Sequence, residues 1–338
     1  MTINQEQIKK IGKFWDKIAE EKPKSDKVTR FFKMLAAEKR LPVRGWLRSV
    51  IRSRGANTTG WWNNPFVVRK VNARICGREI DGRSAGLIEW LKDTYAPLFP
   101  LGKGISVGCG DGSKEIRFMR AGIVASFDLY EFSEKCVEKG GLLARQLGLA
   151  DRTNFRLGDA LEEIKSPEGY DFVVWNDALH HMPDVSAALA WSRRILKPGG
   201  IFALDDFVGA TRWQWPDRQL ALATAVRAAL PLRYRALPSS PFRYPPSKLE
   251  RPTVAYMLEK DPSEAADSDA ILPALSKYFP EATVRKTGGV VYHLALHELL
   301  HNFDPREDRP LLELLLLIDE LCIATGDTHY AAAIGKKS

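Results

Sequence analysis

The sequence has few cysteines and no closely spaced pair of them. The four cysteines lie far apart, at Cys76, Cys109, Cys136 and Cys322. A zinc ribbon needs paired cysteines and a small disulfide-held domain needs a dense framework, so this scatter excludes both classes. The first residues also lack the apolar run of a secretory signal. We therefore expect reduced thiols and a cytoplasmic protein.

Long hydrophobic runs are missing as well. The longest apolar stretch, 311–324, is interrupted by Glu313, Asp319 and Glu320 and is too short to cross a bilayer. We predict a buried helix there instead. With 338 residues, 45% hydrophobic and 27% charged, the chain has an ordinary globular composition and enough length for a sizeable core.

Positive charge is concentrated near the N-terminus. The chain carries a net charge of +8, and residues 21–54 hold eleven Lys and Arg against three acidic residues, which accounts for the whole excess. In the predicted helix 43–54, Arg44, Arg48 and Arg52 lie on a different face from an apolar stripe. This helix either packs on the main domain or contacts an anionic acceptor or the inner membrane face. We assign residues 1–57 as a helical, basic N-terminal extension.

From residue 104 the pattern alternates between strands and helices. Strands are predicted at 104–109, 123–129, 153–160, 170–176 and 201–209, with helices at 113–121, 133–147 and 185–195. This order predicts an α/β fold, a doubly wound Rossmann-like sheet whose core spans 58–210.

After residue 210 the alternation stops, and a proline-rich segment at 231–252 is typical of a lid or a substrate-binding loop. A strand at 282–287 and helices at 271–279, 290–301 and 311–324 follow. We assign residues 211–338 as substrate-binding elements that complete the domain.

A glycine-rich turn ends the first predicted strand. It comprises Gly108, Cys109, Gly110, Asp111 and Gly112. Glycines at this point let a ligand approach the backbone closely. The turn has Ser113 where a dinucleotide-binding turn of the G-x-G-x-x-G type has its last glycine. Asp128 ends the second predicted strand, where a carboxylate can accept hydrogen bonds from ribose hydroxyls. Together these features predict an adenosine-binding half-site for a ligand without a pyrophosphate.

Four segments in order resemble class I S-adenosylmethionine (SAM)-dependent methyltransferases. They are VGCGDG at 107–112, FDLYEFS at 127–133, GDA at 158–160, and YDFVVWNDALHHMPD with LKPGG between 170 and 200. The resemblance covers about 104–208 and implies SAM as the cofactor and S-adenosylhomocysteine as the product. It also implies that the glycine turn contacts the methionine end of SAM and that Asp128 holds the ribose. By the same resemblance Asp159 and Ala160 lie beside the adenine, and Asn176 lies near the methyl group.

Transfer of a methyl group from a sulfonium needs no metal, because the leaving group is already cationic. We therefore expect no metal ion, with positioning supplying much of the acceleration. A hydroxyl acceptor needs a base, and His180 and His181 follow the fourth strand, although both histidines could be structural. Further candidates come from the flanking elements: Asp206 for catalysis, and Arg212, Tyr244 and His293 for acceptor binding.

A second motif, His297 to His301, reads H-E-x-x-H and would place two zinc ligands and a base on one helix. No third ligand motif follows it, and the rest of the chain predicts a different enzyme. The alternative is a helix that carries His293, His297 and His301 along one stripe.

For the acceptor, the first hypothesis is a sugar hydroxyl of a glycan or glycan precursor. Aromatic and arginine-rich residues at 211–218 and 233–244 could stack on sugar rings and bind their anionic groups. Segments 62–65, 208–220 and 288–303 also resemble methyltransferases of bacterial polysaccharide gene clusters. A small natural product or a quinone is the alternative acceptor. A nucleic-acid methyltransferase is a third reading, although Asn176 to Leu179 lacks the N/D-P-P-Y/F signature; the fourth is an inactive SAM-binding protein.

Overall fold

The computed structural model describes residues 13, 16, 60–237 and 244–338. The predicted N-terminal extension falls outside these residues except at Lys13 and Asp16, and the basic helix at 43–54 falls outside them entirely. Its membrane-facing role therefore stays a prediction.

The described residues form a seven-stranded sheet in the order β3-β2-β1-β4-β5-β7-β6. The strands are β1 (Leu101–Val107), β2 (Val124–Glu131), β3 (Thr153–Leu157), β4 (Tyr170–Asn176), β5 (Leu196–Phe207), β6 (Thr283–Gly288) and β7 (Tyr330–Lys336). β7 runs antiparallel to both of its neighbours, and the other pairs are parallel. The predicted Rossmann-like sheet is confirmed. Because the strand order reverses between β1 and β4, a ligand crevice is expected at the carboxyl ends of these two strands.

The sheet extends beyond the predicted core boundary at residue 210. β6 agrees with the predicted strand at 282–287, but β7 inserts between β5 and β6 and was not predicted. Its sequence, YAAAIGK, has three consecutive alanines and few of the β-branched residues that favour strands. The last third of the chain therefore belongs to the same sheet as the glycine turn.

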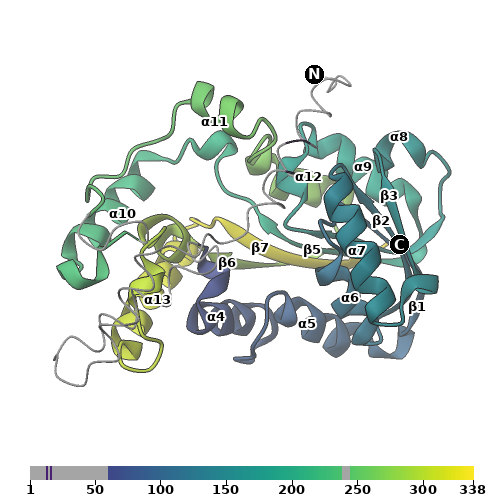
Figure 1. Cartoon of the computed structure of the whole chain (residues 1–338), viewed down its shortest axis with the longest axis horizontal. Coiled ribbons are helices and arrows are strands. Elements are labelled where there is room, and N and C mark those ends of the chain that lie inside the picture. Colours follow the sequence, from purple (N-terminus) through teal and green to yellow (C-terminus); the bar gives the residue numbers. More distant parts are fainter. Residues whose placement is uncertain (1–12, 14–15, 17–59, 238–243) are drawn as a thin grey trace.

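Helices cover both faces of the sheet. They are α4 (Pro65–Cys76), α5 (Ala85–Tyr95), α6 (Ser113–Arg120), α7 (Glu134–Gln146), α8 (Ala160–Glu163), α9 (Val185–Ile195), α10 (Asp217–Ala229), α11 (Val254–Lys260), α12 (Ile271–Tyr278) and α13 (Arg309–Ala324). Figure 1 shows α4 and α5 on one face and α9 and α12 on the other. Side chains of β4 alternate between the two cores, Phe172 and Val174 on the first face and Val173 and Trp175 on the second.

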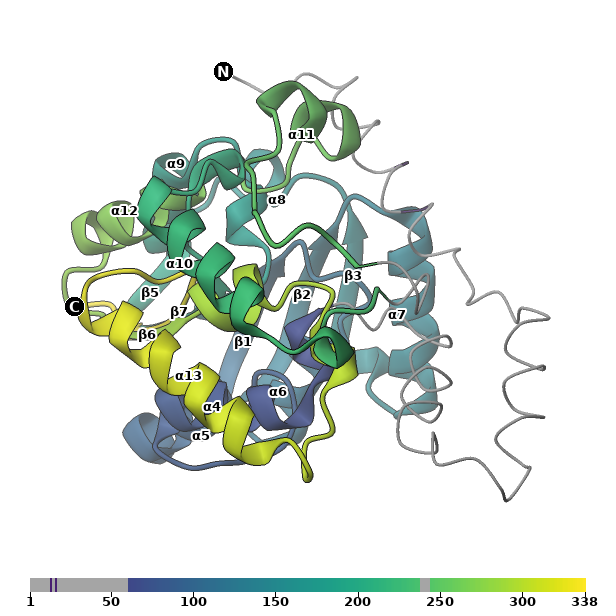
Figure 2. The ribbon, with the colours of Figure 1, turned by 90° about the vertical axis from the view of Figure 1, so that its left-hand side faces the viewer.

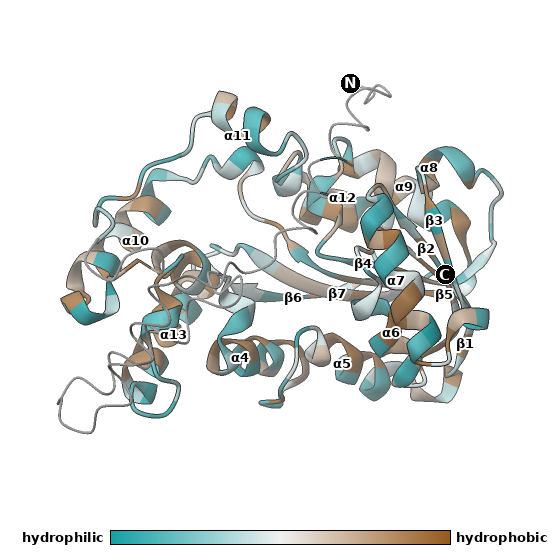
Figure 3. Ribbon diagram, viewed as in Figure 1, coloured by the Kyte–Doolittle hydropathy of each residue, from teal (hydrophilic) through white to brown (hydrophobic). Residues whose placement is uncertain are grey.

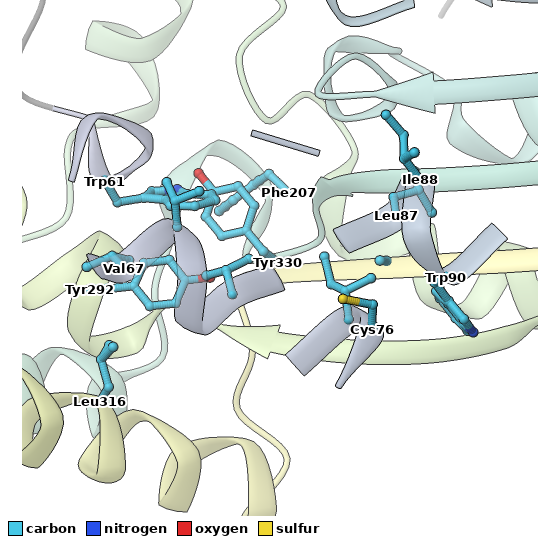
Figure 4. Packing of buried hydrophobic residues seen from close by; sticks show 14 of the residues in the cluster. Trp61, Val67, Cys76, Leu87, Ile88, Trp90, Phe207, Tyr292, Leu316 and Tyr330 are labelled. Carbon is cyan, nitrogen blue, oxygen red and sulfur yellow. The ribbon is translucent and has the colours of Figure 1, made fainter. Parts of the chain in front are cut away.

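An aromatic cluster fixes α4 to the sheet. Trp61 lies edge-on to Tyr292 and Tyr330, with ring centroids 5.2 and 5.3 Å apart (Figure 4). Asn64 then caps α4 by accepting hydrogen bonds from the backbone N–H groups of its first turn, next to Pro65 at the first helical position. The helices that precede β1 therefore share the core of the domain.

The predicted buried helix at 311–324 is confirmed as a helix but only half of it is buried. Leu312 and Leu316 of α13 are buried, whereas Leu314, Leu317 and Leu321 are each more than half exposed (Figure 3). Among the helices that the structure describes, none is both long and apolar enough to span a membrane.

A buried ion pair joins α13 to α4, which lies beside it (Figure 2). The carboxylate of Asp319 accepts hydrogen bonds from Arg74 at 2.8 Å and from the backbone N–H groups of Gly289 and Val291. Burial raises the pKa of the Asp319 carboxyl, against the opposing effect of Arg74. The pair holds the start of a short π-helix, Val290–Ala295.

Replacing Asp319 should destabilise the protein strongly. Asp319→Asn leaves the Arg74 guanidinium buried without its charge partner, which costs about 3–5 kcal/mol of unfolding free energy. Glu320→Gln is the matched control, because Glu320 also contacts Arg74 but its side chain is 54% exposed; this change should cost about 1 kcal/mol or less. Urea denaturation measures both, and equal stabilities would contradict the assigned role of Asp319.

Candidate active site

The glycine turn lies between β1 and α6, as predicted. Gly108, Gly110 and Gly112 all have left-handed backbones, with φ of +67°, +60° and +67°. A Cβ on Gly112 would stand 2.6 Å from the ring of Phe155, so that position has no room for a side chain. Between the glycines, Cys109 is buried, and burial raises the pKa of its thiol. Asp111 accepts a hydrogen bond from the backbone N–H of Ser113 and so stabilises the start of α6.

The structure corrects the predicted role of Asp128. Its register partner is Ile105, so it lies three residues before the end of β2. Both of its carboxylate oxygens are engaged, by Lys103 and Tyr170 at 2.7 Å and by Asn154 at 3.0 Å. These contacts outweigh the effect of burial and hold the pKa of Asp128 below its ordinary value. Asp128 is therefore a strand-pairing residue, and no oxygen remains for a ribose.

Glu131, which the sequence analysis missed, has the position expected of the ribose ligand. It is the last residue of β2, and its Oε2 accepts a hydrogen bond from Gly110 N at 2.7 Å. Its Oε1 accepts from the backbone N–H groups of Phe132 and Ser133. Each carboxylate oxygen has two lone pairs, so Oε2 can still accept a hydrogen bond from a ligand hydroxyl. Strand alternation directs Asp128 and Glu131 to opposite faces, a distinction that depends on where β2 ends.

The third strand ends beside Glu131, which agrees with the predicted adenine side. Gly158 N donates a hydrogen bond to the backbone carbonyl of Glu131 at 3.1 Å. The Asp159 side chain caps α8 by accepting from Leu161 N at 2.8 Å, and Ala160 is fully buried. Asp16 of the N-terminal extension also reaches this edge, where it accepts a hydrogen bond from the Ser133 hydroxyl at 2.7 Å.

A charged cluster lies where β4 ends. The buried side chain of Asn176 exchanges hydrogen bonds with the Ser84 hydroxyl, and its backbone carbonyl accepts from Lys114. Asp177, whose φ is +51°, forms an ion pair with Arg83 at 2.5 Å. Burial acts to raise the pKa of Asp177, but Arg83 and Lys114 outweigh it and keep the pKa low.

A cavity of about 290 Å³ opens at this cluster. Its polar lining comes from Asn72, Arg83, Ser84, Asp177 and Asp205. Burial, together with the charge of Asp177, raises the pKa of Asp205 to about 7. The sequence analysis missed Arg83 and Ser84, because they lie in a loop before α5 without any motif.

His180 lies on the loop after β4 and is fixed by Asp206. Its Nδ1 is 2.5 Å from Asp206 Oδ1. Asp206 is fully buried and also accepts hydrogen bonds from the backbone N–H groups of Ala178, Leu179 and Phe207. Burial acts to lower the pKa of His180, but Asp206 raises it to about 9. The predicted catalytic role of Asp206 is thus corrected to that of a positioning residue.

His181 and Glu264 complete a polar group around His180. His181 Nδ1 is 3.0 Å from Ser263 Oγ, and burial together with His180 lowers the pKa of His181 well below its ordinary value. Glu264 Oε1 lies 4.0 Å from His180 Nε2, and burial raises the pKa of this carboxyl. A backbone hydrogen bond from Ala266 N to the His180 carbonyl, 2.9 Å long, holds the two loops together.

The three predicted acceptor-binding residues have different surroundings. Arg212 has its Nη1 3.0 Å from the carbonyl of Glu264 and so supports the loop that carries this residue. His293 pairs with His329 at 3.1 Å and, like His180, contacts the ring of Phe207. Tyr244 is exposed.

The H-E-x-x-H motif does not form a zinc protease site. The predicted helix at 290–301 is wrong beyond its first turns, because the π-helix ends at Ala295 and Glu298 has a left-handed backbone with φ of +61°. A separate short turn, Leu300–Asn302, carries His301. The two histidines therefore lack the common α-helical face that this motif requires.

The fold and these motifs together define a class I SAM-dependent methyltransferase domain. Residues 102–236 match the family described as a methyltransferase domain, and this part of the chain belongs to that family. SAM is the cofactor of the family.

Known relatives agree at the level of the domain. The chain is 37% identical over 122 residues to 27-O-demethylrifamycin SV methyltransferase of Amycolatopsis mediterranei, a match covering 35% of this chain and 44% of the relative. It is 26% identical over 155 residues to demethylmenaquinone methyltransferase of Leptospira interrogans, covering 46% and 56%. The chain thus spans only about half the length of these relatives.

A solved structure shares the fold over the whole chain. The geranyl diphosphate C-methyltransferase of Streptomyces coelicolor A3(2) aligns with a TM-score of 0.51 and 12% identity, covering 100% of both chains. At this identity the similarity concerns the fold alone.

Glu131, and not Asp128, should control cofactor affinity. Glu131→Ala removes a hydrogen bond to a charged group, which is worth about 1.5–3 kcal/mol and so weakens S-adenosylhomocysteine binding roughly 10- to 100-fold. Asp128→Asn should leave this affinity unchanged, because the side chain contacts other strand residues. Isothermal titration of folded samples measures both, and weakened binding by Asp128→Asn alone would restore the original assignment.

Proposed function

We propose that the protein transfers the methyl group of SAM to a hydroxyl oxygen of a small-molecule acceptor bound next to His180. The observation that carries this proposal is the His180–Asp206 pair, 2.5 Å apart, on the loop directly after β4. A hydroxyl must lose its proton when it is methylated, and a histidine oriented by a buried carboxylate is suited to accept it.

The cofactor would extend along the carboxyl ends of the strands. Glu131 would hold the ribose, with the adenine beside Asp159 and Ala160. The methionine tail carries one carboxylate and one ammonium group on a single carbon. Arg83 and Lys114 would bind the carboxylate and Asp177 the ammonium, since these charges pair with one another at the cavity.

In this arrangement the methyl group would point towards His180. The acceptor oxygen attacks the methyl carbon, the carbon–sulfur bond breaks, and neutral S-adenosylhomocysteine leaves. Nε2 of His180 takes the hydroxyl proton, while Asp206 holds Nδ1. The cationic sulfonium nearby favours the neutral imidazole that this step requires.

For the acceptor, the curated relatives favour a natural product or a quinone, since their names refer to a rifamycin and to menaquinone. The sugar hydroxyl of a glycan precursor stays a prediction. Its supporting side chains are partly engaged within the protein: Trp215 is buried, and Arg218 and Arg233 pair with Asp327 and Asp308. The nucleic-acid and inactive-protein alternatives remain for the same assay to decide.

Arg83 should contribute to the binding of the methionine tail but not of the nucleoside. Arg83→Gln should weaken S-adenosylhomocysteine binding roughly 10- to 100-fold, the worth of a charged hydrogen bond. It should leave binding of 5′-methylthioadenosine, which has no tail, unchanged. Arg69→Gln, an exchange in α4 of an arginine paired with Asp81, is the control. Equal losses for both ligands would exclude a contact between Arg83 and the tail.

The purified chain should release S-adenosylhomocysteine when SAM is mixed with the right hydroxyl compound. A panel of polyketide phenols, quinols, nucleotide sugars, lipid-linked glycans and RNA tests the acceptor class. Each compound is paired with its methyl ether, which should be inert. Transfer to RNA alone, or SAM binding without transfer to any acceptor, would refute the proposal.

With the acceptor found, His180→Ala should lower turnover by about 10²–10⁴ without changing the affinity for SAM. Asp206→Asn tests the positioning role, because it keeps the shape of the side chain but should favour the wrong imidazole tautomer. Near-native turnover in His180→Ala would assign proton removal to another group.

A further inference from the structure

Three metal-binding side chains meet next to the proposed acceptor position. His180, His181 and Glu264 each offer one ligand atom, and these atoms lie within 4.8 Å of one another. Among the described residues this is the one such group. We propose that these three side chains bind a divalent transition-metal ion that the acceptor hydroxyl also contacts.

The hydrogen bonds fix both imidazoles in the tautomer that a metal ion needs. Ser263 Oγ donates its hydrogen to Asp261 Oδ1 at 2.6 Å, so it accepts the hydrogen on His181 Nδ1. Likewise, the Asp206 carboxylate accepts the hydrogen on His180 Nδ1. Each neutral imidazole has one N–H, so the lone pair of both rings is on Nε2.

These partners resemble the outer shell of a protein metal site. Metal-ligating histidines commonly donate their second N–H to a carboxylate or an equivalent acceptor, which orients the ring. His180 has Asp206 in this role, and His181 has the Ser263–Asp261 pair. Glu264 is held by Arg212 at its carbonyl and by the Ala266–His180 backbone bond. The three ligands are thus positioned by separate elements before any ion binds.

The donor set indicates the class of metal. Two imidazoles and one carboxylate suit Zn²⁺, Fe²⁺, Co²⁺ or Mn²⁺, whereas Mg²⁺ and Ca²⁺ prefer oxygen ligands alone. The carboxylates of Glu264 and Asp206 balance the charge of the ion. Three protein ligands leave at least one coordination position open for an acceptor oxygen.

The role of this ion rests on the proposed function, although its binding does not. A bound cation lowers the pKa of a coordinated hydroxyl, whose proton then passes to solvent. The resulting alkoxide attacks the methyl carbon of SAM, the carbon–sulfur bond breaks, and the ether and S-adenosylhomocysteine form. The ion thereby replaces His180 as the group that activates the acceptor, contrary to the metal independence expected from the sequence.

Metal binding can be measured without an acceptor. The chelator-treated full chain is titrated with Zn²⁺ by calorimetry and with Co²⁺ by visible absorption, and one ion per chain is expected. Loss of an outer-shell partner already costs about 10- to 100-fold in metal affinity, so His181→Ala and Glu264→Gln should weaken binding at least that much. His297→Ala, which removes an exposed histidine of the other cluster, is the control. Undetectable binding, or binding lost only in His297→Ala, overturns the site.

Activity then separates the two proposals. Chelation should lower methyl transfer at least tenfold, Zn²⁺ or Mn²⁺ should restore it, and affinity for S-adenosylhomocysteine should not change. Chelator-resistant transfer would overturn the metal's role and leave the proposed function intact. Stoichiometric metal binding with no transfer to any hydroxyl would support the site and refute the function.

Discussion

The buried carboxylate of Asp206 is the interaction on which the candidate site depends most. Its two oxygens accept hydrogen bonds from three backbone N–H groups and from His180 Nδ1. A buried carboxylate is costly unless it is fully hydrogen-bonded, so the loop after β4 has to bring its N–H groups to Asp206. The same bonds that satisfy this charge therefore set the path of the loop and the direction of the imidazole.

Around this point the carboxyl edge of the sheet is crowded with charge. Asp177, Asp205, Asp206 and Glu264 lie near His180, while Arg83 and Lys114 lie at the cavity after β4. The cations come from the loop before α5 and from α6, and the anions come from β5 and the loops after β4 and α11. Such an arrangement fits a cofactor that carries both signs of charge, and it explains why elements outside the family match complete the site.

Local patterns in the chain gave much of the architecture. β4 and α9 have the predicted boundaries, and the glycine turn has the positive φ angles that only glycine adopts easily. By contrast, the half-exposed face of α13 and the insertion of β7 were not predictable. An apolar helix has the same periodicity whether one or both faces are covered, and the pairing of β7 depends on strands far away in the sequence.

The sequence by itself determined the order of the elements, the class of domain and the position of the cofactor turn, because periodicity and glycine spacing are local properties. Only the tertiary structure decided which acid faces the cofactor. Asp128 and Glu131 both belong to β2, but the strand's end and its alternation separate their roles. Tertiary structure also brought Arg83 to Asp177 and Glu264 to His180, since contacts between distant loops leave no periodic trace in the chain.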